Sequence, residues 1–199
     1  MDVVLLFLIF IAFCAILFLK KHIMEVAMIT IETASAKDAP RLLEIYAPYV
    51  KNTAITFEYD VPTLENFSAR IQNTLKKYPY LVLKDDGKIM GYAYAGVFKD
   101  RAAYNRCCEL SVYLDVNAHR RGYGKMLYAA LEKKLREMGI ENLYACIAYP
   151  VVEDEYLTKN SAEFHEHLGF TTVGHFHRCG YKFGRHYDMI WMEKLLESE

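Results

Sequence analysis

The sequence predicts a single α/β domain over residues 28–199, built on a mixed β-sheet flanked by helices. Three observations support this prediction. Strand and helix patterns alternate from Met28 onward, with no internal repeat or linker. The turn residues Asp86-Gly87 separate two apolar runs, which is a strong hairpin signal. A loop containing two glycines then joins a strand to a helix near residue 120. Hairpins combined with strand–helix alternation indicate a mixed sheet.

The first part of the predicted domain contains a strand and two helices. Alternation over residues 29–32 predicts the strand. Asp38 is placed to cap a helix beginning at Ala39-Pro40, and Thr63 to cap a second helix with an apolar stripe. Residues 54–59, between the two helices, are expected to be strand-like or extended.

The rest of the chain supplies most of the sheet. Strands are predicted near residues 80–83, 89–95, 109–115, 143–148, 171–176 and 187–192. A helix after Gly124 is expected to end at Gly139, and a shorter helix over residues 160–168 to end at Gly169.

Residues 1–27 precede this domain and include an unbroken apolar run over residues 3–19, followed by Lys20 and Lys21. As a helix the run would reach roughly 25 Å, slightly short of a hydrocarbon core. No basic segment precedes it and no small-residue cleavage site follows, so a cleaved signal peptide fits poorly. Two interpretations stay open: a membrane anchor with the domain facing the cytoplasm, or translation starting at Met24 or Met28.

The overall composition disfavours several classes of function. Lys and Arg number 24 against 25 Asp and Glu, a net charge of -1, so there is no basic excess to neutralise nucleic-acid phosphates. The five cysteines are odd in number and form no C-x-x-C pair. We therefore expect reduced thiols in a cytoplasmic protein, and neither disulfides nor a cysteine zinc site.

The segment His119-Arg-Arg-Gly-Tyr-Gly-Lys125 carries the main functional signal. Its two glycines allow a tight turn into a helix whose first N–H groups are unpaired, and an anion is favoured there. Arg120, Arg121 and Lys125 add positive charge, so a pyrophosphate is the natural ligand. A nicotinamide-binding site is disfavoured because the third glycine is absent and the loop comes late in the chain. A Walker loop fails because Lys125 lacks its sequence frame.

This loop resembles the [Q/R]-x-x-G-x-[G/A] motif of the GCN5-related N-acetyltransferase (GNAT) superfamily, with His119 where Gln or Arg is usual. Stretches in family order from about Met28 to the C-terminus narrow the resemblance to the phosphinothricin and methionine sulfoximine acetyltransferase branch. They are Ile45-Tyr-Ala-Pro-Tyr-Val, Thr56-Phe-Glu, Tyr78-Pro-Tyr-Leu-Val, Gly91-Tyr-Ala-Tyr-Ala-Gly, Arg101-Ala-Ala-Tyr, Glu109-Leu-Ser-Val-Tyr, Leu168-Gly-Phe and Tyr181-Lys-Phe-Gly.

The resemblance implies acetyl-CoA as cosubstrate and assigns expected roles to particular residues. Glu109 stands where the branch places its general base, and a partly apolar cleft would raise its pKa. His165 lies near the position of a thiolate-protonating tyrosine. It could act as a cationic acid, hydrogen-bond the sulfur, or simply pack near the cofactor. The residues expected to contact acetyl-CoA are Ser111, Val112, Tyr113, Arg120, Arg121, Gly122, Tyr123, Gly124, Lys125 and Asn160.

Lys99, Arg101 and Tyr104 lie in the segment that holds the anionic end of the substrate in the resembling branch. Two cations and a phenol suit a carboxylate or phosphinate through charge-assisted hydrogen bonds. A solvated basic loop is the alternative interpretation. The branch commonly forms homodimers through its C-terminal strands, so the resemblance also implies a homodimer.

Two histidine pairs, at residues 165 and 167 and at residues 175 and 177, raise the question of a metal site. The first pair would lie on different faces of a helix. The second would share one face of a strand, but the sequence shows no matching carboxylate or cysteine frame, so we expect no metal.

These observations predict an acetyl-CoA-dependent N-acetyltransferase acting on the amine of a small, anionic, amino-acid-like molecule. Acetylation of a peptide or protein amine is one alternative. A non-catalytic acetyl-CoA-binding module, which the presence of Glu109 disfavours, is another.

Overall fold

The computed structural model describes residues 28–196, which fold around one seven-stranded sheet. The strands are β1 (Ile29–Thr33), β2 (Tyr80–Asp85), β3 (Lys88–Val97), β4 (Cys107–Leu114), β5 (Asn142–Tyr149), β6 (Thr171–Lys182) and β7 (Arg185–Leu195). Their order is β1-β2-β3-β4-β5-β7-β6, with β4 and β5 parallel and the other neighbours antiparallel. The predicted mixed sheet is therefore confirmed.

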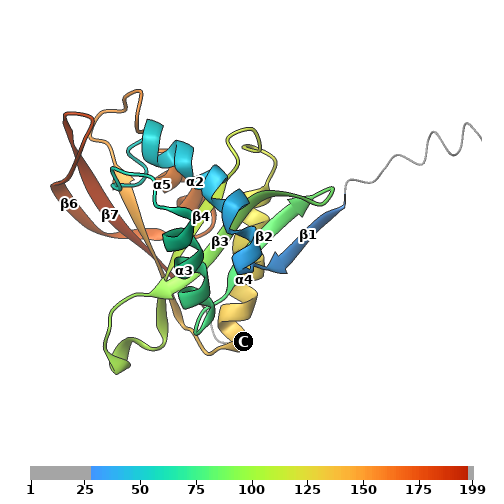
Figure 1. The fold of residues 1–199 in the computed structure, drawn as a ribbon. Helices are drawn as coiled ribbons and strands as arrows, with labels where there is room; N and C mark the ends of the chain where they lie inside the picture. The colour runs from blue at the N-terminus through green and yellow to red at the C-terminus, as the bar shows by residue number, and fades with distance from the viewer. Residues whose placement is uncertain (1–27, 197–199) are drawn as a thin grey trace, which may run out of the picture.

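The helices are α2 (Ala39–Asn52), α3 (Leu64–Leu75), α4 (Tyr123–Glu137) and α5 (Asn160–His167), with 3-10 turns η1 (Ala36–Asp38) and η2 (Ala102–Tyr104). Helices α2 and α3 lie on one face of the sheet, whereas α4 and α5 pack on the other (Figure 1). Successive side chains of β2 point to opposite faces of the sheet. Val82 packs with α2 and α3 on one face, and Leu81 and Leu83 pack with α4 on the other.

Three local predictions differ from the structure. No strand forms over residues 54–59, where residues 54–56 and 59 are bends and residues 57–58 have no regular structure. The start of α2 is organised one turn earlier than expected, because the Asp38 carboxylate accepts from Ser35 N–H at 2.7 Å and does not cap α2. The last two strands are longer than predicted and form a hairpin whose pairing is interrupted by an irregularity between Phe176 and Gly180. The predicted cap of α3 is confirmed, since Thr63 Oγ1 accepts from Asn66 N–H at 3.2 Å.

Within residues 28–196, no helix is both long enough and apolar enough to cross a membrane. The apolar run at residues 3–19 lies outside the described residues.

Candidate active site

Strands β4 and β5 separate in the middle of the sheet. Their parallel pairing runs from Cys107 with Asn142 to Glu109 with Tyr144, although both strands continue beyond these residues. A narrow cleft of about 60 Å³ opens where they diverge. It is lined by residues of β4, β5, α4, α5 and the loop after α2: Ile55, Leu110, Ser111, Val112, Tyr113, Tyr128, Ala145, Cys146, Ile147, Ala148, Ser161 and His165. The expected contact residues of β4 thus face a real cleft.

The glycine loop after β4 has the geometry of an anion cradle. Gly122 takes a left-handed φ of +79° and caps α4, whose first internal hydrogen bond runs from Met126 N–H to Gly122 O at 3.1 Å. The N–H groups of Tyr123, Gly124 and Lys125 therefore have no partner within the helix. The positive end of the helix dipole adds to their attraction for a phosphate.

Side chains around this loop do not all point outward. The Tyr123 hydroxyl donates to the Asp85 carboxylate, and Arg121 Nη1 lies 3.6 Å from the same group. Arg120 and Lys125 are exposed. The contribution of Tyr123 to anion binding is thus its backbone N–H, while Arg120 and Lys125 remain available as charges.

His119 occupies a structural position at the start of the loop. The Tyr49 hydroxyl donates to Leu114 O at 2.6 Å, so its oxygen accepts from His119 Nε2–H at 3.1 Å. The hydrogen bonds attach the loop to α2. The substitution of His for the usual Gln or Arg therefore keeps a polar anchor at this corner.

Glu109 lies at the point where the strands part. Its side chain is half-buried. Burial raises the pKa of the carboxyl group, and the positive charge of Lys99 partly opposes that rise. A carboxylate with a raised pKa is a better proton acceptor near neutral pH than an ordinary glutamate.

An aromatic cluster adjoins Glu109 and was not predicted from the sequence. The ring of Phe98 stacks on Tyr144 with centroids 4.0 Å apart and meets Trp191 edge-on at 5.4 Å. Lys99 Nζ lies 5.2 Å from the Phe98 centroid and 5.7 Å from that of Trp191. These residues come from β5, β7 and the segment after β3, so only the folded sheet brings them together.

The expected substrate residues therefore divide into two groups. Lys99 contacts the aromatic cluster, and Tyr104 packs edge-on against Phe98 at 5.9 Å. The exposed Arg101 contributes its backbone to η2, where its carbonyl accepts from Tyr104 N–H. Among these residues, Lys99 is the one whose positive charge acts on the Glu109 carboxyl group and opposes the rise in its pKa.

His165 is buried at the cleft and both of its ring nitrogens have partners. Nδ1 lies 2.6 Å from Ser161 O and must donate to it, which leaves Nε2 to accept from the Tyr128 hydroxyl at 2.9 Å. Burial lowers the pKa of His165, and the Ser161 bond only partly offsets this. The histidine is therefore neutral in this arrangement, and Tyr128 is a cleft residue that sequence reasoning missed.

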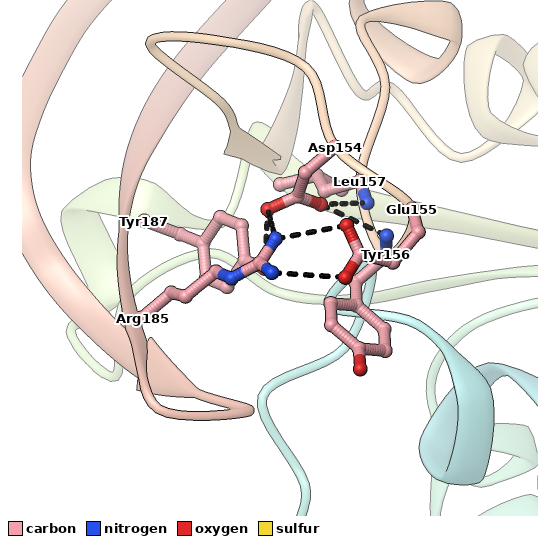
Figure 2. Close-up of polar contacts among 6 residues, drawn as sticks. All are labelled: Asp154, Glu155, Tyr156, Leu157, Arg185 and Tyr187. Carbon is pink, nitrogen blue, oxygen red and sulfur yellow. Dashed lines mark hydrogen bonds and ion pairs between the residues drawn. The ribbon is translucent and has the colours of Figure 1, made fainter.

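The loop before α5 is held by a polar network (Figure 2). Arg185 donates from Nη1 to Asp154 at 2.9 Å and from Nη2 to Glu155 at 2.9 Å, and the Tyr187 hydroxyl donates to Asp154 at 2.9 Å. This network fixes the approach to the exposed Asn160, the first residue of α5.

The cleft and the loop together suit acetyl-CoA. A slot between diverging strands offers main-chain groups to an extended pantetheine arm, and the start of α4 offers N–H groups to a pyrophosphate. Gly124 packs closely at this junction, because an added Cβ would lie 3.0 Å from the Phe164 ring of α5, which would have to shift to admit it.

Comparisons with known proteins agree with this geometry. Residues 31–191 match the acetyltransferase (GNAT) domain family. The L-methionine sulfoximine/L-methionine sulfone acetyltransferase of Pseudomonas aeruginosa is 30% identical over 84% of this chain and 95% of its own. A phosphinothricin acetyltransferase from Sinorhizobium meliloti, solved in complex with AcCoA, is 32% identical with a TM-score of 0.77, covering 84% of this chain and 88% of that one.

A third relative has a different printed activity. The ribosomal-protein-alanine N-acetyltransferase of Brucella melitensis is 33% identical with a TM-score of 0.76, covering 84% of this chain and 99% of that one. Relatives of similar identity thus differ in acceptor but share the transfer of an acetyl group to nitrogen. With the family match, the diverging strands and the phosphate cradle, the chain belongs to the GNAT family and is an acetyl-CoA-dependent N-acetyltransferase.

Proposed function

We propose that the acceptor is the amino group of a small, anionic, amino-acid-like molecule of the phosphinothricin or methionine sulfoximine type. The supporting observation is the half-buried Glu109 at the point where β4 and β5 part, next to the aromatic cluster over which Lys99 lies. The positive charge of Lys99 acts on the Glu109 carboxyl group, whose pKa is raised by burial. The aromatic cluster of Phe98, Tyr144 and Trp191 borders both residues. A zwitterionic substrate needs a base that accepts the proton of its ammonium group, which is the role of Glu109, and a cation that binds its acid group, which is the role of Lys99.

In this proposal Glu109 removes a proton from the substrate ammonium, directly or through one water, so that the free amine can attack the thioester carbonyl. Backbone N–H groups of β4 beyond Glu109 stabilise the oxygen that becomes negative during attack. Lys99 binds the substrate carboxylate or phosphinate with Arg101 and Tyr104, and Asn160 contacts the cofactor from the start of α5.

We propose that His165 acts as a neutral hydrogen-bonding group. Protonating Nε2 would break the hydrogen bond it accepts from Tyr128 and place a charge in a buried site. Its role is thus to orient the Tyr128 hydroxyl beside the cleft, where the thiolate leaves.

The proposal is tested by following free thiol release from acetyl-CoA with the full-length chain. Phosphinothricin, methionine sulfoximine, methionine sulfone and a lysine peptide are offered separately. Rapid turnover on the amino-acid analogues is expected, and Glu109→Gln should reduce kcat/KM by about 10²–10⁴. The exposed Glu137→Gln on α4 is the matched control and should retain parental activity.

Acetylation of a protein or peptide amine is the second candidate, favoured by the similarity to the ribosomal-protein-alanine enzyme. Turnover on the peptide alone, with none on the analogues, would identify that acceptor class and contradict the small-substrate proposal.

We also propose a cytoplasmic homodimer that buries part of the C-terminal hairpin. Val173, Phe176 and Tyr181 of β6 are each about half exposed, which is unusual for apolar side chains on one strand. Light scattering of the purified chain should give the mass of a dimer, and Phe176→Asp should shift it toward a monomer. Residues 3–19 would add membrane anchoring if they insert, which fractionation of cells expressing the chain tests.

A further inference from the structure

Two histidines of β6 and one aspartate of β7 converge at the hairpin. His175 Nε2 lies 2.7 Å from Asp188 Oδ2, and His177 Nδ1 lies 3.1 Å from the same oxygen. The three ligand atoms lie within 4.8 Å of one another, and the two imidazole centroids are 4.3 Å apart. The sequence showed no carboxylate at a metal-ligand spacing from the two histidines. The antiparallel pairing of β6 with β7 brings the Asp188 carboxylate to them.

The backbone around this cluster is held in an unusual conformation. The register between β6 and β7 shifts between Phe176 and Gly180, opposite Asp188. Arg178 within the irregularity takes a φ of +52°, a left-handed value that costs free energy in a residue other than glycine. Arg178 N–H donates to Asp188 Oδ1 at 2.7 Å, which directs the other carboxylate oxygen toward the two histidines.

Burial distinguishes the aspartate from its partners. The Asp188 side chain is 2% exposed, whereas His175 and His177 are 38% and 74% exposed. The cluster thus combines a buried carboxylate oxygen, held in place by the Arg178 N–H, with two imidazoles that are open to solvent.

We propose that His175 Nε2, His177 Nδ1 and Asp188 Oδ2 form a binding site for one divalent transition-metal ion of the zinc type. Two imidazoles and a carboxylate are ligands that zinc accepts, with a fourth position left for water on the exposed side. Ligation requires each ligating nitrogen to be unprotonated. A neutral ring does this by moving its proton to the other ring nitrogen, and a cationic ring by releasing one proton to solvent, so each bound imidazole is neutral. The movements required fall on the two histidine side chains, which are the exposed members of the cluster.

This site lies away from Glu109, although Ala148, the neighbour of Tyr149 on β5, lines the cleft. Asp188 pairs with Tyr149 at the far end of β5, whereas Glu109 pairs with Tyr144 nearer its start. A bound ion would tie the irregular part of β6 to β7. We therefore expect zinc to stabilise the hairpin without taking part in proton transfer at Glu109.

The test uses the untagged full-length chain after treatment with a chelator and its removal. Calorimetric titration with zinc chloride should show one ion per chain, and cobalt chloride should give visible absorption bands of a four- or five-coordinate ion. The variant His177→Asn removes the most exposed ligand, so folding is retained while zinc affinity falls tenfold or more. The exposed His186→Asn on the same hairpin is the control and should bind like the parent.

Two further variants make the result decisive. Asp188→Asn should also abolish binding, although loss of its hydrogen bonds can itself perturb the hairpin. Cys179→Ser should leave affinity unchanged, because the exposed thiol is not among the proposed ligands. Parental zinc affinity in His177→Asn, loss of binding in Cys179→Ser, or no uptake by the parent would each overturn the proposal.

Discussion

Glu109 and Tyr144 are the last residues paired between the parallel strands β4 and β5. The general-base candidate therefore lies where the sheet opens, with a paired backbone on one side and the cleft on the other. Its side chain is thereby carried by a paired strand and half-buried, and the positive charge of Lys99 acts on it. This placement has consequences for activity and for stability.

The pH dependence of catalysis should reflect the raised pKa of Glu109. In the parent enzyme, kcat/KM should rise with pH through that pKa, because only the ionised carboxylate accepts the ammonium proton. The substrate amine also titrates and can produce a similar rise in kcat/KM. The rise is assigned to Glu109 only if it is absent from the residual activity of Glu109→Gln. A low-pH limb that is identical in parent and variant would exclude Glu109 as the base.

The same residue should lower stability at neutral pH. Because the folded pKa lies above the unfolded one, the folded chain binds more protons between them, and stability falls as pH rises through that interval. Glu109→Gln should therefore melt at a higher temperature than the parent at pH 8, with the gain shrinking as the pH approaches 4.5. Glu137→Gln should show no such pH-dependent difference in thermal denaturation.

Gly122 and Gly87 have nearly equal φ angles, so substituting each in turn distinguishes the effect of backbone strain from the effect on cofactor binding. Gly122 at the phosphate loop has φ +79° and Gly87 in the β2–β3 turn has φ +76°, and an added Cβ would meet no atom within 4 Å at either. Alanine at either position should cost about 1 kcal/mol of unfolding free energy from left-handed strain. Only Gly122→Ala should also raise KM for acetyl-CoA, which steady-state kinetics would measure. An equal rise in Gly87→Ala would mean that the effect is general destabilisation.

Lys182 supports the loop that borders the cleft. Its side chain is buried, and Nζ donates to Val50 O at 2.8 Å, Thr53 O at 2.8 Å and Thr56 O at 2.7 Å. Lys182→Met leaves these carbonyls without their charged donor, so unfolding free energy in urea should fall by about 3 kcal/mol. The exposed Lys88→Met serves as control, and a loss below 1 kcal/mol in Lys182→Met would show that water replaces the ammonium.

Asp154 should make the loop before α5 sensitive to acid. Burial alone would raise its pKa, but hydrogen bonds from Tyr156 N–H, Arg185 and Tyr187 outweigh it and lower the pKa below 3.8. Its stabilisation is therefore present above pH 3.8 and lost as the pH falls through the folded value. Asp154→Asn should cost about 1–2 kcal/mol at pH 7, discounted for its partial exposure. The parent and variant stabilities should converge in acid, and a constant difference down to pH 2 would contradict this.

The amino-acid sequence by itself determined the α/β class, the hairpin at Asp86-Gly87, the helix cap at Thr63 and the strand–loop–helix unit around Gly122. Each of these depends on residues close together in the chain, so periodicity and turn chemistry are enough to reveal them. The sequence also placed Glu109 on the strand that enters this unit, through a resemblance that the family match confirms.

Only the tertiary structure decided which distant side chains meet. The stacking of Phe98 on Tyr144 beside Trp191 and the hydrogen bond from Tyr128 to His165 join elements far apart in sequence. The approach of Asp188 to His175 crosses between the two strands of one hairpin and depends on their register. Strand order and register create these contacts, and they depend on the packing of the whole sheet, which local pattern does not encode. For the same reason spacing alone predicted no metal site at the C-terminal hairpin, because the third ligand reaches the two histidines only when β6 and β7 pair.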